Sequence, residues 1–151
     1  MKPYQHDFVR EVRKRGLWVI EHSDGNLNPI LSDLIEPGLN GLHPIEPAAM
    51  KISSVKQQFG DRICVIGNVD CGNTMTLGTE DDVRRDVRRC IDEASAGGGH
   101  VLSASNTLHW QIPVRNVLAM VDEAKKYGRY PWPGEQVVKE WRSRKRVQSD
   151  S

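Results

Sequence analysis

Four short groups of polar residues carry the side chains that could do acid–base or ligand chemistry. Their members are His22, Asp24 and Asn26; His43 and Glu46; Asn68 and Asp70; and Ser105, Asn106 and His109. Imidazoles and carboxylates transfer protons, whereas amides and hydroxyls orient a polar ligand through hydrogen bonds. Polar residues are also common in ordinary turns, so each group is informative only together with the others.

Each polar group follows a short apolar stretch and precedes an apolar pattern with helical spacing. We predict strands over residues 17–21, 41–43, 63–66 and 100–103, and helices over residues 3–15, 27–35, 48–59, 79–96 and 113–127. This alternation is typical of an α/β fold, either an open parallel sheet or half of an eight-stranded (β/α) barrel. In both architectures the polar groups meet at the carboxyl ends of the strands, where each strand connects to the following helix. There they would line a concave small-molecule site.

Two of the predicted helices carry specific signals. Thr79 and Asp82 have the spacing of a capping box, and the apolar face of the helix that follows consists of Val83, Val87, Cys90, Ile91 and Ala94. The helix after Pro113 has an apolar pattern at Val114, Val117, Leu118, Val121 and Ala124. We therefore expect both helices to pack on the sheet through these faces. Asn26 has a side chain suited to cap the second helix, and Cys64 and Cys90 fall at expected core positions.

The composition fits one folded domain of ordinary size. The chain has 151 residues, 38% hydrophobic and 27% charged, with 21 Lys and Arg against 20 Asp and Glu. This balance does not favour bulk capture of nucleic acid. No apolar run approaches the roughly 20 residues of a membrane span, and no secretion signal is evident, so we expect a cytoplasmic protein. The three cysteines lack paired spacing, which argues against a disulfide framework or a cysteine zinc cage.

Several stretches resemble one known family in their order and spacing. They are His22–Asn26, Gly41–Pro47, Phe59–Arg62, Gly67–Asp70, the three glycines before Val101, Pro113–Asn116 and Tyr127–Pro131. Together they resemble the C-terminal half of the uroporphyrinogen decarboxylase (URO-D) family, which also includes methylcobamide:coenzyme M methyltransferases. The resemblance implies half of a (β/α)8 TIM barrel over residues 1–131, with four parallel strands each followed by a helix and one helix before them. Residues 132–151 would form a C-terminal helix or basic tail.

The decarboxylase branch implies a cofactor-free reaction on a carboxylated tetrapyrrole. Such an enzyme protonates a pyrrole carbon, holds the cation near a carboxylate and releases carbon dioxide. The catalytic candidates are His22, Asp24, Asn106 and His109. The substrate-binding candidates are Asn26, His43, Glu46, Asn68, Asp70 and Ser105. Where these decarboxylases carry a histidine after the last strand, this chain has Asn106. No segment matches the family's arginine-rich grip on the substrate, so we expect activity to be incomplete in this chain alone.

Two alternatives remain open. The methyltransferase branch implies zinc held by a His-x-Cys turn and a later cysteine, with a corrinoid and a thiol as substrates. Here the turn is His22-Ser23-Asp24 and the later position is Asn106, so the zinc candidates are His22, Asp24 and Glu46, with Cys71 as one available sulfur. The other alternative is a non-catalytic remnant or interaction domain.

The expected half barrel also implies a partner. Four strands of a barrel leave two unpaired edges and an open apolar interior. We therefore expect either a homodimer or association with a missing N-terminal barrel half.

Overall fold

The four predicted strands form one parallel sheet. The computed structural model describes residues 2–129. Its strands are β1 (Ile20–Ser23), β2 (Gly41–Pro44), β3 (Cys64–Ile66) and β4 (His100–Val101). They lie in the order β1-β2-β3-β4, and every neighbouring pair is parallel. The predicted half barrel of four strand–helix units is confirmed.

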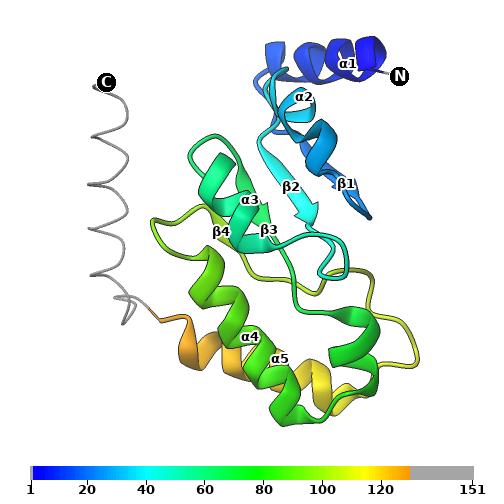
Figure 1. The fold of residues 1–151 in the computed structure, drawn as a ribbon, viewed down its shortest axis with the longest axis vertical. Coiled ribbons are helices and arrows are strands. Elements are labelled where there is room, and N and C mark those ends of the chain that lie inside the picture. The colour runs from blue at the N-terminus through cyan, green and yellow to red at the C-terminus, as the bar shows by residue number, and fades with distance from the viewer. Residues whose placement is uncertain (1, 130–151) are drawn as a thin grey trace.

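The helices follow the strands in alternation (Figure 1). They are α1 (Lys2–Lys14), the 3-10 helix η1 (Asn28–Ile30), α2 (Leu31–Ile35), α3 (Ile52–Phe59), the π-helix η2 (Cys71–Met75), α4 (Glu80–Ala94) and α5 (Val114–Tyr127). In Figure 1, α1 and α2 lie at one end of the molecule, and α4 and α5 pack together at the other. The predicted C-terminal helix or tail, residues 132–151, lies outside the described residues.

Some predicted boundaries were wrong for local reasons. The first strand begins at Ile20 rather than residue 17, because ladder pairing starts where Ile20 faces Gly41. The third helix begins at Ile52 rather than residue 48, because the Glu46 carbonyl accepts from the N–H groups of Ala49 and Met50 and closes a turn there. The second predicted helix is divided into η1 and α2.

The connection predicted over residues 67–78 contains the short helix η2. Asp70 begins it, since its Oδ1 accepts from the backbone N–H groups of Gly72 and Asn73 at 2.8 and 3.0 Å. The Thr79 and Asp82 capping box that starts the next helix, α4, is confirmed in both of its hydrogen bonds.

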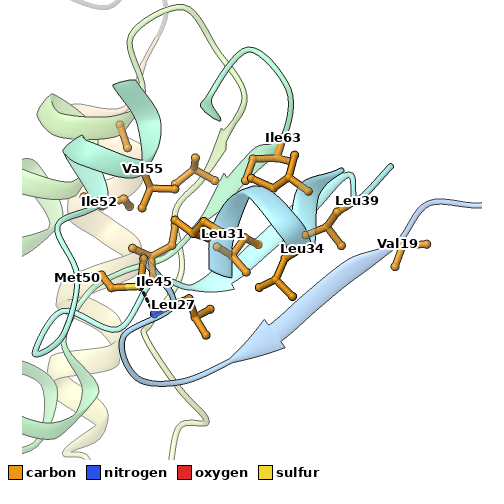
Figure 2. Packing of buried hydrophobic residues seen from close by; sticks show 14 of the residues in the cluster. Val19, Leu27, Leu31, Leu34, Leu39, Ile45, Met50, Ile52, Val55 and Ile63 are labelled. Atoms are coloured by element: carbon orange, nitrogen blue, oxygen red, sulfur yellow. Dashed lines mark hydrogen bonds between the residues drawn. The ribbon is translucent and has the colours of Figure 1, made fainter. Parts of the chain in front are cut away.

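The helix-facing side of the sheet is closed by apolar packing. Leu42 of β2 and Val65 of β3 have no exposed surface. Figure 2 shows Leu31 and Leu34 of α2 on the same cluster as Ile52 and Val55 of α3. The Leu27 N–H donates to Met50 Sδ at 3.2 Å and joins the two helix entrances. Burial of these side chains is the main favourable contribution to folding in this half of the molecule.

A second cluster joins α4 to α5. The predicted α4 face, Val83, Val87, Cys90, Ile91 and Ala94, is buried throughout. Cys90 is therefore a core residue as predicted, whereas Cys64 is only half-buried.

The predicted apolar face of α5 was partly wrong. Val114 and Leu118 are 73% and 57% exposed, and the buried residues of α5 are Asn116, Ala119 and Glu123. Asn116 Nδ2 donates to the carbonyls of Met75 and Gly78, both at 2.9 Å. Glu123 accepts from Arg88 Nε at 2.6 Å. These polar contacts turn α5 so that Val114, Leu118 and Val121 lie on its exposed side, while Val117 and Ala124 pack against the core.

Gly67 permits the close approach of the ends of β2 and β3. Its φ is +138°, and a Cβ at this position would lie 2.2 Å from the Pro44 carbonyl oxygen. Any side chain here would therefore push apart the two strand ends from which the second and third polar groups emerge.

His100 connects β4 to two neighbouring segments. Its Nδ1 contacts Ser95 Oγ at 2.8 Å, and its Nε2 lies 2.8 Å from the Gly67 carbonyl oxygen. Burial lowers the pKa of His100 from its usual value near 6.5, because the charged ring would lose hydration. In the unfolded chain this ring takes up a proton at a higher pH than in the folded chain. The burial of His100 therefore destabilises the fold as the pH falls below about 6.5.

Replacing His100 should weaken the pH dependence of stability. We expect the free energy of unfolding of the unmodified chain to fall between about pH 7.5 and pH 5.5, and His100→Gln to reduce that slope, because the variant lacks the buried titrating ring. Urea unfolding at both pH values measures the difference. The matched control is His109→Gln at an exposed position, which should retain the original slope. Equal slopes in His100→Gln and the unmodified chain would contradict this account.

Candidate functional site

The site begins with two histidines on neighbouring strands. The parallel register places His22 of β1 directly beside His43 of β2. Their Nδ1 atoms lie 2.8 Å apart, and the ring centroids are 4.8 Å apart at a tilt of 43°. Because side chains alternate along a strand, these rings lie opposite the buried helix-facing residues. They share this inner face with Ile20 and Ile66, whose side chains would contact a Cβ placed at Gly41.

A carboxylate–amide pair joins the first loop to the last. Asn106 Nδ2 donates to Asp24 Oδ1 and Oδ2 at 3.2 and 3.3 Å, across 82 residues of sequence. Asp24 Oδ1 lies 3.9 Å from His22 Nε2, and both side chains are about half exposed. His43 Nε2 lies 3.2 Å from the Ala104 carbonyl oxygen. The structure therefore brings His22, Asp24, His43 and Asn106 together at the carboxyl ends of the strands, within reach of solvent.

Asn68 and Asp70, the third polar group, make their contacts away from the histidine pair. Asn68 is 1% exposed, donates to the Ile45 carbonyl at 2.7 Å and accepts from Arg89 Nη2 at 3.1 Å. Asp70 starts η2 and lines a separate cavity of about 430 Å³ beside α3 and α4, together with Asp86 and Arg89. Neither side chain has a hydrogen bond to the histidine pair, and no member of that pair lines this cavity. Their predicted contact with substrate stays a prediction.

Ser105 and Cys71 support the last loop from beneath. Ser105 is 2% exposed, and its Oγ accepts from the Cys71 N–H at 3.0 Å. The Cys71 thiol donates to the Asn106 carbonyl at 3.3 Å. Burial raises the pKa of Cys71, and the charges of Asp70 and Glu46 add to this rise. Cys71 is thus a protonated thiol that holds the Asn106 backbone. Sequence reasoning considered it only as an available sulfur, although its place directly after Asp70 marks the same strand end.

His109, Asn26 and Glu46 are the remaining candidate site residues. His109 is exposed and contacts Thr76 Oγ1 at 3.4 Å, near the end of η2. Asn26 Oδ1 accepts from the Asn28 N–H at 3.1 Å, so it stabilises the entrance to η1 through a local turn. Glu46 is half-buried, and its charge acts on Cys71. No hydrogen bond within residues 2–129 links these three side chains to the histidine pair.

The donor set does not fit the zinc site that the family resemblance implies. Among the described residues, no group of three or more His, Cys, Asp and Glu side chains is placed to hold a metal ion. His22 Nδ1 already faces His43, and both Asp24 oxygens accept from Asn106. Asn106, where the resemblance implies the later cysteine, carries an amide that donates to Asp24 and offers no thiolate. Glu46 does not complete the set with His22 and Asp24.

The strand order and the helix after each strand define the class of fold. Four parallel strand–helix units with polar side chains at the carboxyl ends of the strands form half of an α/β barrel. A methyltransferase from Methanosarcina mazei has the same fold over 85% of this chain and 36% of its own, with a TM-score of 0.72 and 26% sequence identity. No helix in residues 2–129 is long and apolar enough to cross a membrane.

Sequence comparisons agree with this class. The family model for uroporphyrinogen decarboxylase (URO-D) matches residues 1–127, and the chain belongs to that family. A uroporphyrinogen decarboxylase from Thioalkalivibrio sulfidiphilus is 29% identical over 79 residues, 52% of this chain and 22% of the relative. Methylcobamide:CoM methyltransferase MtaA from Methanosarcina barkeri is 27% identical over 106 residues, 70% of this chain and 30% of the relative. The chain therefore spans less than a third of the length of these relatives.

Two cysteine substitutions should convert the carboxylate–amide pair into a zinc site. In the double variant Asp24→Cys with Asn106→Cys, two thiolates would join His22 at positions whose present side chains already touch. We expect about one zinc ion per chain after dialysis against zinc and buffer, whereas the unmodified chain retains far less. Elemental analysis measures the metal, and each single variant is the matched control. Stoichiometric zinc in the unmodified chain would contradict the conclusion that its donor set does not fit.

Proposed function

We propose that this chain supplies the C-terminal wall of a decarboxylase site for a carboxylated tetrapyrrole. The observation that carries the proposal is the contact of His22, Asp24, His43 and Asn106 at the carboxyl ends of three strands. The reaction replaces a carboxylate with hydrogen, so it needs a proton donor and an anion near the transient cation. The imidazole pair can exchange the proton, and Asp24 supplies the negative charge.

The proposed roles follow from what each side chain already contacts. His22 exchanges the proton at its solvent-accessible edge, and Asp24 faces the cationic intermediate. Asn106 holds Asp24 by donating to both carboxylate oxygens. His109 is a second proton donor only if substrate reaches past Asn106 toward Thr76. Ser105 and Asn68 keep the loops in place, because their polar atoms are already bonded within the protein.

The rest of the site must come from elsewhere. The chain contains no segment resembling the family's arginine-rich carboxylate grip, and it spans less than a third of its relatives. We therefore assign it half of the machinery. The proposed reaction requires an N-terminal barrel half, which would bind the carboxylates and close the site.

The second candidate is methyl transfer between a corrinoid and a thiol. It is supported by the structural match to a methanogen methyltransferase and by the coverage of MtaA. Zinc would stabilise the thiolate of the acceptor in such a reaction. The carboxylate and amide at residues 24 and 106 argue against it. A non-catalytic unit is the third candidate, and it predicts binding of neither ligand.

Complementation in trans should separate these candidates. We expect the chain, combined with the N-terminal half of the Thioalkalivibrio uroporphyrinogen decarboxylase, to remove carboxyl groups from uroporphyrinogen, as measured by chromatography and mass spectrometry of the products. His22→Gln should lower the rate by at least about 100-fold, because general acid–base catalysis contributes on that scale. Lys125→Gln, on the exposed surface of α5, should leave it unchanged. Thiol-dependent loss of the methyl group from methylcobalamin, without decarboxylation, would establish methyl transfer instead. Inactivity with both substrates would favour the non-catalytic candidate.

Exposed apolar side chains flank both edge strands. Along the chain, those up to and including the start of β1 are Tyr4 and Phe8 of α1, then Leu17, Trp18 and Ile20, and those from β4 onward are Val101, Leu108 and Trp110, then Val114, Leu118 and Val121 of α5. Val114, Leu118 and Val121 recur at helical spacing and form one stripe on α5. Unpaired parallel edges beside exposed apolar surface favour association. We propose that, without a separate N-terminal half, two copies pair β1 of one with β4 of the other.

The isolated chain should therefore be a dimer. We expect light scattering to give about twice the 17.0 kDa chain mass, and Ile20→Lys with Leu118→Lys to shift the protein toward monomer, because two charges would enter the apolar interface. The control, Lys125→Gln, should remain dimeric. Circular dichroism checks that the Lys variant stays folded. A folded monomer of the unmodified chain would contradict the pairing.

A further inference from the structure

The contact between His22 and His43 restricts where protons can reside. The two Nδ1 atoms are 2.8 Å apart, which requires one hydrogen between them. On the other side of His43, Nε2 faces the Ala104 carbonyl oxygen at 3.2 Å. A carbonyl oxygen only accepts hydrogen bonds, so His43 Nε2 must carry a hydrogen.

The neutral pair consequently has one arrangement that satisfies both contacts. A neutral imidazole has one N–H, and that of His43 is on Nε2. His43 Nδ1 is then an acceptor, and the hydrogen between the rings belongs to His22 Nδ1. This leaves His22 Nε2 without a hydrogen. Its lone pair lies at the half-exposed edge of the ring, 3.9 Å from Asp24 Oδ1.

When the pair holds one added proton, the nitrogen at its solvent-exposed edge also has a fixed state. If the charge is on His22, that ring carries hydrogens on both nitrogens. If the charge is on His43, its Nδ1–H donates to His22 Nδ1, and neutral His22 must carry its hydrogen on Nε2. Both arrangements place a hydrogen on His22 Nε2. A second added proton would place two N–H groups against each other across the 2.8 Å contact between the Nδ1 atoms. The pair therefore holds only one added proton as long as the two Nδ1 atoms stay in contact.

From this accounting we infer that His22 Nε2 is the atom through which the histidine pair gains and loses its proton, and that His43 is the positioning residue that fixes this tautomer. Proton release leaves the lone pair on His22 Nε2. Where the charge was on His43, the hydrogen between the rings returns from His43 Nδ1 to His22 Nδ1. The contacts around the rings comprise the Asp24 carboxylate, the neutral Asn106 amide that holds it and the Ala104 carbonyl.

In the proposed decarboxylation, His22 Nε2 is the atom that hands the proton to the substrate. Its use in catalysis rests on that proposed function, whereas the tautomer assignment rests on geometry alone. A proton delivered from Nε2 to a substrate carbon would leave the pair in its neutral arrangement, ready to take up another proton from solvent. Asp24 faces the same edge, so it would stabilise the protonated pair and then the cation formed on the substrate.

Nitrogen NMR of the unmodified chain tests the assignment without substrate. At about pH 8.5, where ordinary imidazoles are neutral, we expect His22 as the Nδ1–H tautomer and His43 as the Nε2–H tautomer. A scalar coupling between the two Nδ1 nuclei should report the shared hydrogen. Lowering the pH should bring the first new N–H of the pair to His22 Nε2. Single His→Gln variants at residues 6, 100 and 109 assign the remaining ring signals.

Two substitutions at residue 43 separate positioning from packing. His43→Phe keeps a ring but has no acceptor, so the Nδ1–H signature of His22 should be lost in favour of Nε2–H. His43→Asn places an amide oxygen where Nδ1 lies, and it should restore that signature. An Nε2–H tautomer of neutral His22 in the unmodified chain, or no coupling between the rings, would overturn the inference. So would an unchanged His22 tautomer in His43→Phe. Because none of these readouts needs substrate, failure of decarboxylation would leave them intact.

Discussion

The side-by-side register of β1 and β2 determines most of what this site can do. It sets His22 against His43 on the inner face of the sheet while Leu42, the residue between the paired positions, packs without exposure on the other face. A shift of one residue would exchange these faces and bury an imidazole among aliphatic side chains. The packing of α2 and α3 on Leu42 therefore fixes the histidine pair as well as the core. Gly67 serves the same end, because it lets the end of β3 approach Pro44.

The two faces of the sheet differ in how completely they are covered. Helices bury the outer face, whereas Ile20 and Val101 are 60% and 50% exposed. In a closed barrel both positions would be covered by further strands and by the side chains of the interior. The exposed apolar side chains of β1 and β4 are therefore those that half of a barrel leaves uncovered. The polar loops at the carboxyl ends are incomplete for the same reason, since they surround only half of a barrel mouth.

Periodicity and turn chemistry predicted much of this fold because local signals and tertiary packing agree there. The Thr79 capping box and the buried face of α4 are examples, and the parallel order of strands follows from strand–helix alternation. The face of α5 was predicted only in part. Val117 and Ala124 pack as expected, but the buried hydrogen bonds of Asn116 and the ion pair of Glu123 leave the rest of the apolar stripe exposed. The helix η2 was also missed, since its start depends on Asp70 accepting from two backbone N–H groups, a contact that a Gly-rich turn equally allows.

The sequence predicts that the polar residues gather at the strand ends, but it does not predict which of them face the site and which turn into the core. Spacing places His22, Asp24, His43 and Asn106 at or just beyond the carboxyl ends of strands, and parallel pairing brings them together. It does not distinguish them from Asn68, which follows a strand equally closely yet turns inward to bond Ile45 and Arg89. That distinction depends on α4, which offers Arg89 as a partner for a buried amide.

The chemistry of the site follows from which atoms are already engaged. A metal centre needs several donor atoms directed at one point, and no three His, Cys, Asp or Glu side chains of residues 2–129 are placed in that way. Instead, Asp24 accepts from Asn106, and His22 Nδ1 shares a hydrogen with His43. In the neutral pair, the nitrogen whose lone pair is open at the solvent edge is His22 Nε2. A single nitrogen beside a carboxylate suits proton exchange better than metal binding. In the proposed function, the side chains at residues 24 and 106 therefore matter through what they place beside the imidazole of His22, which is a carboxylate held by an amide.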